Sequence, residues 1–167
     1  MKKFLAIILL LTVFGTSKSF AGSTTATANV NLSINASFSV NNIRTAIIMG
    51  NVVTPGAVTV DPQTAGNNAA AFSLTGPIST PITISWPATV TITNGTDNLT
   101  VTPSVTGNTA NNQVASTVLT NPSAGVVTSA TVSNPCYYFW VGAGTTVPSP
   151  LPSSGAYSGS VTVTITY

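Results

Sequence analysis

The chain has 167 residues, of which 4% are charged, and it contains neither histidine nor glutamate. From residue 22 onward the charged residues are Arg44, Asp61 and Asp97 alone, whereas an ordinary soluble domain is about a quarter charged. This composition excludes the clustered basic residues of a nucleic-acid interface and removes most groups that enzymes use in catalysis. We therefore predict a protein that is not an enzyme.

Residues 1–21 are typical of a cleaved Sec-type signal peptide. Two lysines give a basic start, and residues 4–14 form an apolar run too short to span a bilayer comfortably. Small residues at 19 and 21 match the two positions that signal peptidase reads. We expect cleavage after Ala21, export to the periplasm, cell surface or medium, and no membrane span after cleavage.

Residues 22–167 are dominated by Thr, Ser, Asn, Val, Ala and Gly. β-Branched residues favour strands, and Asn and Gly favour the turns between them. Residues with high helix propensity, such as Glu, Lys and Gln, are nearly absent. We predict one all-β domain over this range.

The clearest pattern opens that domain, where apolar residues alternate strictly with Thr, Asn or Ser. Such alternation predicts a strand with one buried face, here one long strand at 25–41 or one strand bent across two sheets. This is the candidate strand-addition segment. Its apolar residues are Ala26, Ala28, Val30, Leu32, Ile34, Ala36, Phe38 and Val40.

Shorter alternating segments follow, separated by turn signals such as Pro55-Gly56 and Asn94-Gly95. Altogether about ten short strands indicate an antiparallel β-sandwich or a barrel, and the proline-rich breaks favour the sandwich. Residues 106–124 are expected to form a surface loop, with a weaker strand within it. The strands expected after the first are at 45–49, 57–60, 70–75, 81–86, 88–93, 98–105, 114–119, 125–132, 137–141 and 160–167.

The C-terminal strand alternates as regularly as the first, with threonine at every second position. Its apolar residues are expected to face the core. They are Val161, Val163, Ile165 and Tyr167.

Several of these segments, in this order and spacing, resemble the secreted bacterial family known as domain of unknown function 4402. The resemblance covers nearly all of residues 22–167 and implies an Ig-like β-sandwich, with no established activity and no functional residues to transfer. The matching segments are 24–28 (TTATA), 49–52 (MGNV), 55–62 (PGAVTVDP), 71–76 (AFSLTG), 82–87 (ITISWP), 90–95 (VTITNG), 141–144 (VGAG) and 155–167 (GAYSGSVTVTITY).

The closing segment, a Gly-x-Tyr-x-Gly turn before an alternating strand, is also similar to the spore coat U-type pilins of archaic chaperone–usher systems. That similarity implies an exported fimbrial subunit and an export chaperone as a partner. The chain departs from many pilins in having a single cysteine, Cys136, which cannot close an internal disulfide.

The isolated polar candidates have simple interpretations. Asp61 precedes a proline and Asp97 follows Asn94-Gly95, so each is expected to bond the backbone of its own turn. Asp97 with Asn94, Asn98 and backbone carbonyls is a thin alternative calcium site. Arg44 is expected to lie in water or to pair with one aspartate. We predict no cofactor.

Cys136 opens the apolar run at 136–141 and is expected to be buried, with an intermolecular disulfide as the alternative. The aromatic residues suit either the core or an exposed sugar-stacking surface. They are Trp86, Tyr137, Tyr138, Trp140 and Tyr157.

The function expected from these features is an exported structural or adhesive, fimbria-like surface subunit. It would associate with itself or with other surface subunits by β-strand addition of the alternating segment. Two alternatives stay open: the segment is the domain's own first strand, or the protein is a carbohydrate-binding module.

Overall fold

The computed structural model describes residues 25–33, 38–131 and 135–167. These residues form twelve strands and no helix, so none of them belongs to a helix that could cross a bilayer. The strands are β1 (Thr25–Ser33), β2 (Ser39–Arg44), β3 (Ala46–Asn51), β4 (Gly56–Val60), β5 (Ala70–Thr75), β6 (Pro81–Ser85), β7 (Val90–Thr93), β8 (Asn98–Asn108), β9 (Thr117–Val118), β10 (Ser123–Val127), β11 (Tyr137–Val147) and β12 (Tyr157–Thr166).

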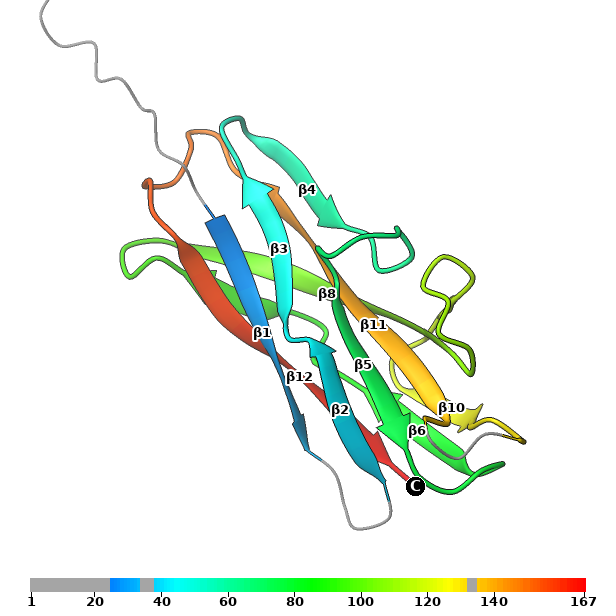
Figure 1. Ribbon diagram of the computed structural model, residues 1–167. Coiled ribbons are helices and arrows are strands. Elements are labelled where there is room, and N and C mark those ends of the chain that lie inside the picture. Colours follow the sequence, from blue (N-terminus) through cyan, green and yellow to red (C-terminus); the bar gives the residue numbers. More distant parts are fainter. Residues whose placement is uncertain (1–24, 34–37, 132–134) are drawn as a thin grey trace, which may run out of the picture.

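The strands join in one mixed, nearly barrel-shaped sheet, with the order β10-β6-β12-β7-β8-β11-β5-β2. β1 lies beside this path, between β12 and β3, while β4 pairs with β11 and β9 with β8. Figure 1 shows an elongated molecule in which β1 and β12 run the same way and the C-terminus lies at the end where β1 finishes.

The all-β class is confirmed, and most strands lie within a few residues of their expected positions. The sheet is not purely antiparallel, because β1 pairs with β12 in parallel. The expected strand at 25–41 is also divided: β1 ends at Ser33, and β2 pairs with β5 elsewhere in the sheet. β8 extends to Asn108, into the region expected to be a loop.

The core forms where alternating strands turn their apolar sides inward. Phe72 of β5 and Phe139 of β11 are 1% and 0% exposed, and their rings stack with centroids 5.1 Å apart. Stacked aromatic pairs add roughly 0.5–1.5 kcal/mol beyond the burial of their area. β11 is apolar on both faces because it lies centrally, between β8 on one side and β5 and β4 on the other.

One contact between β11 and the turn after β4 depends on a missing side chain. A Cβ atom on Gly142 would lie 2.1 Å from the Val60 carbonyl oxygen and 2.6 Å from Pro62 Cδ. Real Cβ atoms do not approach backbone so closely. Glycine at this position therefore lets the two segments pack directly.

Candidate functional site: the seam around β1

β1 occupies a seam between the last strand and β3. On one side it pairs in parallel with β12, and Val30 lies opposite Val161. On the other side it runs antiparallel to β3, and Ala28 lies opposite Ile47. The structure thus places the two segments predicted as sites, the strand-addition segment and the C-terminal strand, side by side (Figure 1).

The alternation in sequence explains how β1 sits in the seam. Ala28 and Val30 are 3% and 7% exposed, whereas Asn29 and Asn31 between and beyond them face solvent. On β12, Val161 and Val163 are fully buried. Burial of an alanine and a valine contributes only a modest hydrophobic stabilisation, so backbone hydrogen bonds carry much of the attachment.

Close packing at the start of the seam requires small residues. Gly159 of β12 lies opposite Ala28, and a Cβ atom there would lie 2.7 Å from the Thr91 carbonyl oxygen of β7. β12 is therefore confined between β1 and β7 at this point, and a larger residue would push the strands apart.

The remaining predicted site residues lie beyond the seam or outside the described residues. Phe38 is buried and packs edge-on against Tyr167, with ring centroids 5.0 Å apart. Val40 lies half-buried on β2. Tyr167 is 48% exposed, so it does not continue the buried row of β12. Ile34 and Ala36 lie outside the described residues.

Asp61 bonds the backbone of its own turn, as expected, whereas Asp97 bonds the backbone of a loop that lies far from it in the sequence. Asp61 Oδ1 accepts the Gln63 amide at 2.9 Å. Asp97 Oδ2 accepts the Ser153 amide at 2.6 Å, and this hydrogen bonding with Ser153 lowers the pKa of Asp97 below its usual value of 3.8. Asn94 Oδ1, a second oxygen of the calcium alternative, accepts the amides of Thr96 and Asp97.

Ser153 anchors the loop between β11 and β12, a role that sequence reasoning missed. Besides donating its amide to Asp97, it accepts hydrogen bonds at its carbonyl from Asn94 Nδ2 and the Tyr157 hydroxyl, both at 3.0 Å. The preceding loop contains Pro148, Pro150 and Pro152, which restrict its conformations. The proline spacing was visible in the sequence, but the partners across the turn were not.

We expect the Asp97–Ser153 contact to make stability depend on pH. Because the pKa of Asp97 is lowered on folding, its contribution is complete above the unfolded value of 3.8 and is lost as the pH falls through the lower folded value. Urea unfolding should therefore find Asp97→Asn less stable than the wild type at pH 7, with the difference shrinking toward pH 2. A difference that stays constant across this range would contradict the assignment.

Arg44 joins the loop before β5 to the loop after β8 instead of lying free or pairing with an aspartate. Its Nε donates to the Ala69 carbonyl and its Nη2 to Gln113 Oε1, both at 3.0 Å. Gln113 Nε2 in turn donates to the Pro62 carbonyl at 3.0 Å. The one arginine after residue 22 is thus satisfied by neutral oxygens.

Cys136 is fully buried, as expected, and donates its thiol to the Leu74 carbonyl at 3.3 Å. Burial raises the pKa of the thiol, so the reactive thiolate is disfavoured. An intermolecular disulfide would require this residue to leave the core.

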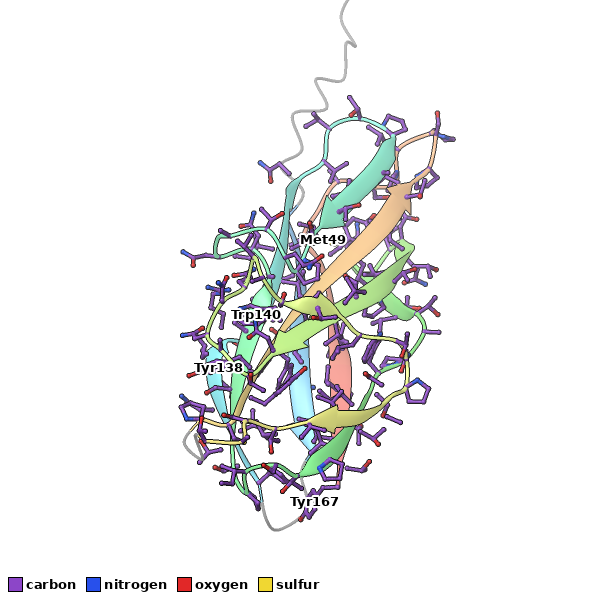
Figure 2. All side chains as sticks on the ribbon, turned by 90° about the vertical axis from the view of Figure 1, so that its right-hand side faces the viewer. Met49, Tyr138, Trp140 and Tyr167 are labelled. Atoms are coloured by element: carbon purple, nitrogen blue, oxygen red, sulfur yellow. The ribbon has the colours of Figure 1, made fainter. Side chains whose placement is uncertain are left out.

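The five aromatic candidates do not form an exposed stacking surface. Tyr137, Trp140 and Tyr157 are at most 4% exposed, and burial raises the pKa of Tyr137 to about 12. Trp86 and Tyr138 are half-buried. Figure 2 shows Tyr138 and Trp140 side by side on β11, where their rings stack at 6.4 Å. Trp140 is the buried residue of this pair. The structure therefore gives little support to an exposed sugar-stacking surface.

A family model described as Domain of unknown function (DUF4402) matches residues 13–167, which include every strand of the sheet. No curated protein matches the chain.

Proposed function

The chain belongs to this family, whose description assigns no activity, and we propose that it is an exported structural or adhesive surface subunit that self-associates by exchange of β1. Export rests on the leader at 1–21, which lies outside the described residues. The similarity of the closing segment to spore coat U-type pilins is a second support.

We also propose that the sheet is an Ig-like β-sandwich. What supports this is the small number of backbone pairs that join two groups of strands, one ending at β12 and the other beginning at β7. β12 pairs with β7 at one position, Ser158 opposite Thr93, whereas β8 and β11 pair over eight positions. A sheet joined so narrowly folds readily into two packed layers.

The observation that carries the proposed exchange is the position of β1. It is the first described strand, and it fills a seam whose two walls, β12 and β3, belong to other parts of the chain. A second copy has an identical β1. If that strand entered the seam of the first copy, it would make the same backbone hydrogen bonds and bury the same small residues.

The length of the connection limits how two copies can meet. Residues 34–37 separate Ser33 from Phe38, so an exchanged β1 reaches at most about 18 Å from its own domain. Domains that exchange β1 must therefore touch near the end where β1 finishes and β2 begins. Phe38 and the partly exposed Tyr167 lie at that end.

A disulfide between copies tests the exchange directly. Asn29 and Ser160 lie opposite each other on β1 and β12, and both are exposed. Adjacent strands are close enough for a disulfide. We expect chains carrying Asn29→Cys, refolded together with chains carrying Ser160→Cys and then oxidised, to give a disulfide-linked mixed dimer on non-reducing gels.

Two further experiments serve as controls for the mixed-dimer result. Asn29→Cys mixed with Val114→Cys, an exposed residue outside the seam, should give little linked dimer. The double variant Asn29→Cys with Ser160→Cys reports pairing within one chain. If it closes completely as a monomer, and the mixed chains yield no linked dimer at any concentration, β1 belongs permanently to its own domain and the exchange is wrong.

A further inference from the structure

A cavity of about 470 Å³ lies at the end of the molecule where β1 begins. Its floor consists of core residues, with Met49, Ile92, Val147 and Tyr157 each at most 8% exposed. Figure 2 shows Met49 in the half of the molecule opposite Tyr167. Val53 and Leu151 line the cavity from exposed positions, so an apolar surface continues to its mouth.

The wall formed by the loop between β11 and β12 is fixed in place. The three hydrogen bonds of Ser153 tie this loop to the turn after β7 and to Tyr157 on the floor. Pro150 and Pro152 line the cavity from the same loop. A wall with this much restraint resists collapse onto the floor, so the cavity is formed before any ligand arrives.

The chemistry of the lining selects the ligand. None of the described residues that line the cavity is charged, and its polar side chains are the hydroxyls of Thr145, Ser153, Ser154 and Tyr157. The hydroxyls of Thr145 and Tyr157 already donate to carbonyl oxygens within the protein. The nearby carboxylate of Asp97 does not line the cavity, and it already accepts the Ser153 amide. A charged ligand group would therefore lose its hydration here without gaining a charged partner in the lining.

We propose that this cavity binds an uncharged apolar molecule, of the class of a hydrocarbon chain with a small neutral polar head. The volume falls within the range of about 300–1,000 Å³ that is typical of small-molecule sites. The chain of the ligand packs against the floor, and its head lies at the mouth near the serines. The site is independent of β1 exchange, because its lining comes from β3, β4, β7, β8, β11, β12 and their connecting loops.

The test uses protein expressed from the full chain and the neutral fluorescent dye Nile red. We expect saturable binding of one dye per protein, with a rise in fluorescence. 1-Dodecanol should displace the dye, whereas dodecanoate and dodecyltrimethylammonium, compared below their micellar concentrations, should be at least about tenfold weaker because they bring a charge into the cavity. Non-saturable dye binding, or equal displacement by all three, would overturn the proposal.

A matched pair of variants locates the site. Val53→Asp places a charge at the mouth, and Val114→Asp places the same charge at an equally exposed residue outside the lining. Val53→Asp should weaken dye binding about tenfold or more, and Val114→Asp should leave it unchanged. Leu151→Asp serves as a second mouth variant should Val53→Asp fail to fold. Equal binding by the mouth variants and the control would place the dye elsewhere and refute this cavity as the site.

Discussion

A chain that lacks residues 22–33 is expected to lose most of its stability and to recover it when a peptide with the sequence of β1 is added. Removing β1 breaks its pairing with β12 and β3 together and uncovers fully buried Val161 and Val163. With a net value of about 0.5–1.5 kcal/mol per hydrogen bond, the loss is on the order of 5 kcal/mol, a large part of the stability of a typical domain. Thermal unfolding, followed by circular dichroism with and without the peptide, measures both effects.

Two altered peptides show whether the rescue depends on the seam. A peptide with Val30→Asp carries a charge at a buried position, and one with Asn31→Asp carries the same charge at an exposed position. The first should fail to restore stability and the second should succeed. If both rescue equally, the peptide binds without the register seen between β1 and β12, and strand addition through this seam loses its basis.

Gly142→Ala is expected to destabilise the protein by about 2–4 kcal/mol, because overpacking against backbone forces strands apart. The added methyl would lie 2.1 Å from the Val60 carbonyl oxygen, and neither this atom nor the adjacent Pro62 ring can move aside as a flexible side chain would. For a domain of this size the loss corresponds to a fall in melting temperature of roughly 5–15 °C. Differential scanning calorimetry provides the measurement.

Gly144 supplies the control on the same strand. A Cβ atom there would meet nothing closer than Thr59 Oγ1 at 3.6 Å, which is an ordinary contact. Gly144→Ala should therefore be nearly neutral or slightly stabilising, because alanine restricts the unfolded chain. Equal losses in the two variants would mean that the close approach to Val60 is not the cause, because Gly144 has no such contact.

Local patterns predicted most strands, because alternation and turn residues are properties of neighbours in the sequence. The strand β5 was predicted with its exact bounds, and Val161, Val163 and Ile165 face the core as expected. The sequence pattern did not locate the break between β1 and β2, because an unbroken alternation fits one strand or two. The parallel pairing of β1 with β12 could not be read from either strand, because alternation does not encode a partner or a direction.

The candidate site was predicted in part for the same reason. The regular alternation of residues 26–40 singled out a segment that contains β1, but the neighbours of β1, β12 and β3, emerge only from the topology. Arg44 bonds oxygens that lie far from it in sequence, so its partners could not be anticipated from composition. The cavity gathers residues from widely separated segments, and no local motif marks it.

The pairing of the first strand with the last has a consequence for how the molecule is made. Val30 is synthesised long before its partner Val161, which lies far from it in the sequence. Such long-range contacts carry a large loop-closure entropy, which slows folding. Until β12 is complete, β1 is an apolar strand with an open edge, ready to join any other chain. The period between the synthesis of β1 and that of β12 is therefore when this chain is most exposed to pairing with the wrong partner.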